Sequence, residues 1–140
     1  MILYCNYEEL TALKAGTRVL LDRAEADSER ARLSPRLRAD VENLLPLLDG
    51  DISLSTLGEV LSVERAVIAI VRHMRVDMET KVVVTHPAEE GAVAAYFDFA
   101  HGFVVEHRVR EMAAEMEALI ELVTGEEPTR EAVGSFDFSD

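Results

Sequence analysis

The spacing of apolar residues predicts one long helix from His86 to Gly125, and its two halves differ in character. The first half, Ala92 to Val105, is apolar except for Asp98 and His101. A helix that is apolar all round has to be enclosed on all sides, either by a second copy of the chain or by the rest of the same subunit. The second half is apolar along one face only. That face contains Val105, Val109, Met112, Met116, Leu119, Ile120 and Val123.

Two shorter helices are predicted in the first third of the chain. Asn6 begins the first of them, because Glu9 three residues later completes the reciprocal pair of hydrogen bonds called a capping box. Ser34 and Pro35 begin the second, since proline at the first helical position loses no hydrogen bond. Pro46 is then expected to end or kink that helix.

The middle of the chain predicts a short helix followed by a stronger one. Thr56 and Glu59 cap the short helix, which is expected to reach about Leu61, and Ser62 is expected to lead into the stronger helix. The stronger helix carries its large apolar residues in one sector and charged residues on the opposite side. The apolar sector contains Val63, Val67, Ile70, Val71, Met74, Met78 and Val82, and the charged side contains Arg65, Arg72, Arg75 and Glu79.

Residues 57–68 also have the spacing of a helix-turn-helix, a motif that reads DNA. Ser62 stands where that motif usually has glycine, and the second helix would present Glu64, Ala66 and Val67 where base contacts need arginine, lysine or amides. A net charge of −13 further disfavours a phosphate backbone as a partner. We therefore interpret this spacing as two packed helices, and we expect no nucleic-acid partner.

Two segments at the ends of the chain are typical of strands. Residues 2–4 are short and apolar, and residues 135–139 alternate apolar and polar positions, so the two segments are candidates to pair as a small ribbon. The whole pattern predicts a single all-α domain over residues 1–140. Its expected architecture is an antiparallel helical bundle of about four main helices, built on the long C-terminal helix.

Composition adds mainly an expectation about the cellular compartment of the protein. At 140 residues the chain is long enough to bury a packed core, and it has one cysteine, Cys5, so no disulfide can form within it. No apolar stretch reaches the ~20 residues of a membrane span, and the N-terminus lacks a basic and apolar leader. We expect a soluble, cytoplasmic protein with no membrane partner.

The charge is distributed unevenly along the chain. Between Arg18 and Arg38 six arginines outnumber four acids, whereas from Glu106 onward ten acids face only three arginines. Surfaces of opposite charge attract each other, within one molecule or between two copies.

Four residues form the candidate metal or ligand site. Asp98 and His101 lie three apart, and His73 and Asp77 lie four apart, so each pair can meet on one helix face. Carboxylate and histidine pairs on neighbouring helices resemble the metal sites of helical bundles. The alternative is structural: a buried histidine neutralised by its aspartate, with His73 in solvent.

The sequence contains no motif that specifies a reaction, and it identifies no cofactor. We expect a small helical interaction or regulatory module, homodimeric through the apolar half of the long helix, rather than an enzyme. A protein partner fits the same role. The alternative function is a metal- or small-ligand-binding bundle that uses Asp98 and His101, with His73 and Asp77 beside them.

Overall fold

The computed structural model describes residues 1–26, 32–79 and 99–125, which are mostly helical with a small two-stranded antiparallel sheet. Along the chain the elements are β1 (Ile2–Leu3), α1 (Tyr7–Glu25), α2 (Pro35–Leu44), the 3-10 turn η2 (Leu45–Leu47), β2 (Ile52–Ser53), α3 (Leu57–Glu79) and α5 (Phe99–Thr124). The predicted helical class is confirmed. Among these described helices, none combines the length and the apolar character that a membrane crossing requires.

Several helix ends lie where the sequence predicts them. Asn6 Oδ1 accepts a hydrogen bond from Glu9 N, and Glu9 Oε1 accepts one from Asn6 N, both at 2.8 Å, so the capping box is complete. Ser34 Oγ accepts from the backbone of Leu37 at the start of α2. Gly125 adopts a φ of 73°, a left-handed conformation that favours glycine. Its N–H donates to Glu121 O in the last turn of α5 at 2.7 Å.

The prediction of two helices between Thr56 and Val82 was wrong. α3 runs from Leu57 to Glu79 without a break, so no helix ends or begins at Ser62. The Ser62 hydroxyl donates instead to Asp40 Oδ1 of α2, at 2.7 Å. Because residues 57–68 contain no turn, the helix-turn-helix spacing has no structural counterpart.

The N-terminal strand exists, but its observed partner is a segment that the sequence analysis did not identify. β1 pairs with β2 in antiparallel fashion, with Ile2 opposite Ser53 and Leu3 opposite Ile52. Leu3 and Ile52 point inward and are buried, which explains their apolar character. Residues 135–139, the partner proposed from the sequence, lie outside the described residues.

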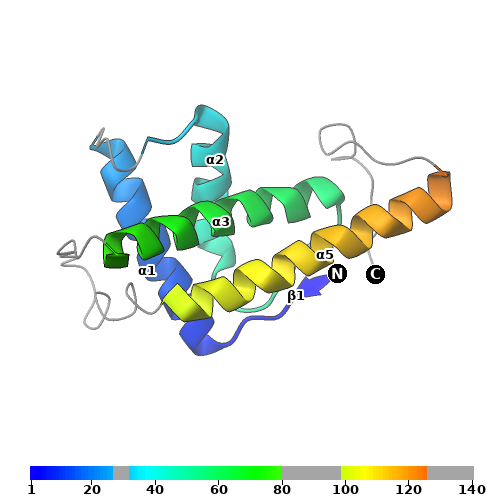
Figure 1. Ribbon diagram of the computed structural model, residues 1–140, viewed down its shortest axis with the longest axis horizontal. Coiled ribbons are helices and arrows are strands. Elements are labelled where there is room, and N and C mark those ends of the chain that lie inside the picture. Colours follow the sequence, from blue (N-terminus) through cyan, green and yellow to red (C-terminus); the bar gives the residue numbers. More distant parts are fainter. Residues whose placement is uncertain (27–31, 80–98, 126–140) are drawn as a thin grey trace.

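The helices pack in two directions (Figure 1). α3 and α5 lie side by side and antiparallel, while α1 and α2 cross them. α1 contacts both α3 and α5, and α2 contacts mainly α3. The core between them is formed by leucine, valine, isoleucine, alanine and methionine side chains of all four helices.

Glycine allows the closest approach between α1 and α3. A Cβ atom at Gly16 would lie 2.6 Å from Ile70 Cγ2 and 2.7 Å from Met74 Sδ, which is closer than real Cβ atoms come to other atoms. Gly102 of α5 is similar, with Val71 Cγ2 at 3.0 Å. These two glycines let α1 and α5 lie against α3 at short distance.

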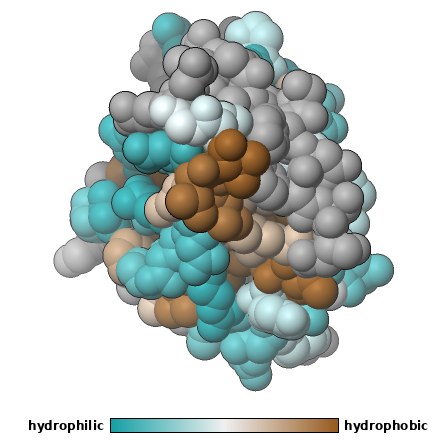
Figure 2. All heavy atoms as spheres, turned by 90° about the vertical axis from the view of Figure 1, so that its right-hand side faces the viewer, coloured by the Kyte–Doolittle hydropathy of each residue, from teal (hydrophilic) through white to brown (hydrophobic). Residues whose placement is uncertain are grey.

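The C-terminal end of α5 extends past β1 and the start of α3 (Figure 1). Its predicted apolar face is buried at Val105, Val109, Met116 and Ile120, but Leu119 and Val123 are 40% and 69% exposed. Leu122, beside them, is 81% exposed. Figure 2 looks at this end of the molecule and shows apolar side chains gathered near its centre.

The all-round apolar half of the predicted long helix is described only from Phe99 onward. There the expected enclosure is incomplete, because Phe103 and Val104 are 51% and 42% exposed. Residues 86–98, which would complete this half, lie outside the described residues.

Candidate ligand-binding site

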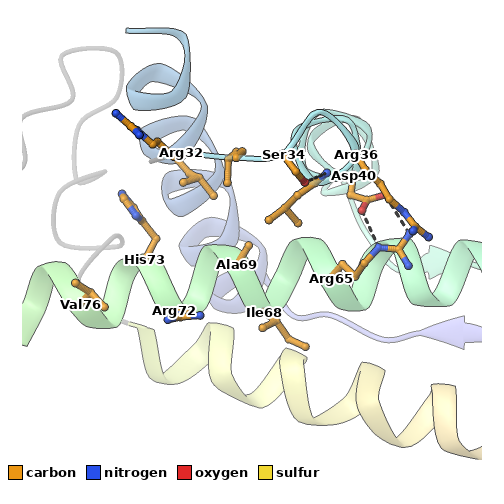
Figure 3. A pocket seen from close by; sticks show the side chains of 13 residues that line it. Arg32, Ser34, Arg36, Asp40, Arg65, Ile68, Ala69, Arg72, His73 and Val76 are labelled. Carbon is orange, nitrogen blue, oxygen red and sulfur yellow. Dashed lines mark hydrogen bonds and ion pairs between the residues drawn. The ribbon is translucent and has the colours of Figure 1, made fainter. Parts of the chain in front are cut away.

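A cavity of about 610 Å³ opens between α1, the start of α2 and the middle of α3 (Figure 3). This volume is typical of small-molecule sites, which span roughly 300–1,000 Å³. Its apolar wall is formed by Leu20, Leu33, Leu37, Ile68, Ala69 and Val76. Its polar side chains are Arg32, Ser34, Arg36, Asp40, Arg65, Arg72 and His73.

One face of α3 supplies much of this wall. The residues recur at spacings of three and four, which places them on one stripe of a helix, beside the stripe that enters the core. They are Arg65, Ile68, Ala69, Arg72, His73 and Val76. In the sequence pattern, Arg65 and Arg72 belong to the charged face of this helix, opposite its apolar sector. That face is in part the wall of a cavity, because α2 packs over it.

Asp40 is the carboxylate of the cavity, and α3 already engages it. Arg65 Nε donates to Asp40 Oδ2 at 2.8 Å, and Ser62 Oγ donates to Oδ1 at 2.7 Å. Asp40 is 7% exposed, so these charge-assisted bonds compensate the loss of water around it. The contact fixes α2 on α3 and balances the charge of Arg65.

Two arginines of the cavity have no such balance. Arg36 on α2 and Arg72 on α3 are exposed, and neither forms a hydrogen bond or ion pair within the part of the chain that the structure describes. In all, four of the 14 lysine and arginine residues line this cavity, although the chain carries a net charge of −13. The cavity is therefore a positive region on an acidic protein.

A buried polar cluster borders the cavity where α1 meets α3. Arg23 Nη1 of α1 lies 2.7 Å from His73 Nε2 and also donates to Asp77 Oδ2. His73 Nε2 and Asp77 Oδ2 are 3.9 Å apart. His73 and Asp77 are 9% and 1% exposed, so Asp77 supplies the counter-charge that Arg23 needs beside the core.

The chemistry of this cluster assigns a role to His73 Nε2. Arginine has donors only, so a guanidinium hydrogen bond to Nε2 requires that nitrogen to be unprotonated. His73 Nε2 is therefore the acceptor of this contact. In Figure 3 the His73 ring stands above α3 on the side of α1, as this contact requires.

The four predicted site residues are thus described only in part. His73 and Asp77 meet, as expected, but they share Arg23, and His73 is buried rather than in solvent. His101 is half-buried on α5, and Asp98 lies outside the described residues, so their pairing stays a prediction. Within the described segments, no three His, Cys, Asp or Glu side chains are placed to hold a metal ion.

Cys5 lies in a smaller recess with Glu9, Asp51 and Arg108. The pKa of its thiol is raised from 9.0 to about 11, mainly by burial and also by the Glu9 and Asp51 carboxylates, while Arg108 lowers it. A thiol with this pKa is protonated at neutral pH and is a poor nucleophile. The structure supports the interpretation of Cys5 as a packing residue.

The arginine cavity was missed because no single residue in it is unusual. The available signal was the second stripe on α3, where arginines alternate with apolar residues at helical spacing, together with the arginine-rich segment from Arg18 to Arg38. What the sequence does not show is that α2 crosses α3 at this stripe.

Comparison with known protein families found no match, and comparisons with curated proteins and with solved structures found none either. The function is therefore argued from the geometry of the site.

Proposed function

We propose that this chain is a small helical binding domain whose cavity between α1, α2 and α3 takes an acidic ligand. The observation that carries the proposal is that Arg36 and Arg72, which have no partner among the described residues, line a cavity with an apolar wall. Guanidinium groups bind carboxylate and phosphate oxygens in pairs, and the apolar wall gains by covering an organic body. The domain is proposed to be an antiparallel bundle that works in the reducing cytoplasm.

This proposal differs from the ligand site expected from the sequence. The site lies on α2 and α3 and does not use Asp98 or His101. His73 borders the new site, but its Nε2 is occupied by Arg23, as is Asp77. The Arg23 guanidinium already occupies His73 Nε2 and Asp77 Oδ2, so a metal cation would have to displace it. The cluster therefore fits the wall of an anion site better than it fits a metal site.

The test is binding of a simple organic acid. Octanoate and its neutral partner octanol are titrated into the protein by calorimetry, and we expect measurable binding of octanoate only. Arg36→Gln and Arg72→Gln should each weaken octanoate about tenfold. Arg75→Gln is the matched control, because Arg75 does not line the cavity and its Nε lies 3.9 Å from Glu79 Oε1. Equal binding of octanol, or an equal effect of Arg75→Gln, would contradict the proposal.

A second proposal is that the protein acts as an interaction module by pairing with a second copy. The observation that favours it is the end of α5, where Leu119, Leu122 and Val123 recur at helical spacing and are 40%, 81% and 69% exposed. Contiguous exposed apolar side chains mark interaction sites more often than isolated ones do. Each copy carries a charge of −13, so salt should strengthen the pairing by screening the repulsion.

Light scattering during gel filtration measures this pairing directly. We expect about twice the 15.5 kDa mass of one chain, and a return to one chain mass in Leu122→Glu. Tyr7→Glu is the control, because Tyr7 is 78% exposed on α1, away from this end of α5. A mass of one chain for the unchanged protein at all concentrations and salt levels would refute self-association.

A further inference from the structure

We infer that the acidic ligand of the arginine cavity is the end of α5, residues 115–123, from a second copy of this chain. This contact rests on the proposed function, because it names the ligand of the cavity that is proposed to take an acidic group. It brings together two surfaces of the molecule, the cavity between α1, α2 and α3 and the exposed apolar end of α5.

The end of α5 has the pattern of a helix that docks in an apolar groove. Leu119, Leu122 and Val123 recur at spacings of three and four, and they are 40%, 81% and 69% exposed. Helices that bind in grooves use apolar anchors at this spacing. The cavity offers the matching surface, since Leu37 and Ile68 are among the apolar residues of its wall. Docking would therefore remove apolar surface of both partners from water.

The charged groups around the two surfaces have opposite sign. Glu115 and Glu121 are exposed at the end of α5. Arg36 and Arg72 are exposed at the cavity and lie at opposite ends of it (Figure 3). One small anion can reach only one of these arginines, whereas a helix with separate carboxylates presents charge to both.

Charge also favours the cavity over a second α5 as the partner of this helix end. A contact of α5 with another α5 would bring Glu115 and Glu121 of both copies together, and like charges at an interface are unfavourable. The described chain is acidic as a whole, but four arginines line the cavity. Complementary charge selects which surfaces meet, so it directs the acidic end of α5 to the cavity.

The contact forms between copies, because each chain keeps its own two surfaces apart. The end of α5 extends past the start of α3, whereas the α3 residues of the cavity lie between Arg65 and Val76 (Figure 1). Two copies that each place the end of α5 in the cavity of the other form a closed pair with two-fold symmetry. Such a pair has the mass of two chains.

A mixture of two variants tests this contact. The double variant Arg36→Glu, Arg72→Glu keeps the end of α5 and reverses the charge of the cavity, whereas Leu122→Glu keeps the cavity. These three positions are exposed, so both variants are expected to fold, and circular dichroism verifies it. Alone, each variant should self-associate about tenfold more weakly than the unchanged protein in sedimentation equilibrium. Mixed in equal amounts, the two should pair, because one of the two contacts is intact, and native mass spectrometry should find one chain of each.

The matched control is the double variant Arg38→Glu, Arg75→Glu. It makes the same change of charge on the same two helices, and neither residue lines the cavity. The control should self-associate as the unchanged protein does. If it loses self-association as the cavity variant does, the effect comes from overall charge and the contact is refuted.

Two other results would overturn the contact. Variants that do not pair when mixed would show that the end of α5 does not dock in the cavity. Undiminished self-association of the cavity variant alone would show that pairing does not use its arginines. Octanoate binding to Leu122→Glu judges the proposed function separately. If octanoate binds and the variants do not pair, only the contact fails; if neither occurs, the proposed acidic-ligand site fails as well.

Discussion

The ion pair between Glu9 of α1 and Arg108 of α5 is expected to stabilise the packing of these two helices, which lie near opposite ends of the described chain. Glu9 is 2% exposed, and its Oε1 accepts from Asn6 N at 2.8 Å and from Arg108 Nη1 at 2.6 Å. Arg108 Nη1 also donates to Tyr4 O at 2.9 Å. Replacing Arg108 with alanine therefore leaves a buried carboxylate with one neutral donor.

The magnitude follows from the exposure of the two partners. Hydrogen bonds to charged groups contribute about 1.5–3 kcal/mol, and water weakens the pair because the Arg108 side chain is 40% exposed. We expect Arg108→Ala to lower the free energy of unfolding by about 2 kcal/mol. Glu9→Gln should cost less, because a glutamine oxygen still accepts from Asn6 N.

A double-mutant cycle isolates the pair. Urea unfolding of the two single variants and the double variant should give a coupling energy of about 1–2 kcal/mol between Glu9 and Arg108. Arg110→Ala is the control, since Arg110 is more exposed and lies 3.4 Å from Glu106. A coupling energy below about 0.5 kcal/mol, or equal effects of Arg108→Ala and Arg110→Ala, would refute the reasoning.

Four further predictions concern three single positions. Gly16→Val should lower the free energy of unfolding by about 1–3 kcal/mol, because its Cβ would meet Ile70 at 2.6 Å; a melting temperature equal to that of the unchanged protein would contradict the close approach. Gly125→Ala should cost about 1 kcal/mol in urea unfolding, since alanine resists a φ of 73°. Alkylation of Cys5 at pH 8 should be about 100-fold slower in the folded protein than after unfolding, because its pKa is about 11 instead of 9.0. For the same reason, stability should fall as pH rises from about 9 toward 11, where the unfolded chain loses the proton first.

The predictions that succeeded depend on local chemistry. The capping box at Asn6, the proline start at Pro35 and the glycine end at Gly125 each involve residues within one helical turn. The failures depend on distant partners. Ser62 resembles a helix start in sequence, but Asp40 of another helix takes its hydroxyl.

The candidate site shows the same limit. The spacing of His73 and Asp77 correctly predicts that they meet, but nothing local indicates that Arg23, 50 residues away, contacts both of them. In the sequence, the arginines of α3 resemble the charged face of an amphipathic helix. Only the position of α2 across α3 shows that they line a cavity. The packing of neighbouring helices determines which side of an amphipathic helix faces solvent and which side lines a cavity.

The contact of Arg108 with the first helix also has a consequence for biosynthesis. Its hydrogen bonds to Glu9 and Tyr4 span 99 and 104 residues, and Gly102 packs near Leu13. A ribosome adds about 5–20 residues per second, so α1 is made roughly 5–20 s before the α5 residues that cover it. Until then the inward side of α1 and the Glu9 carboxylate lack their final neighbours. The surroundings of α1 are therefore complete only after α5 has emerged.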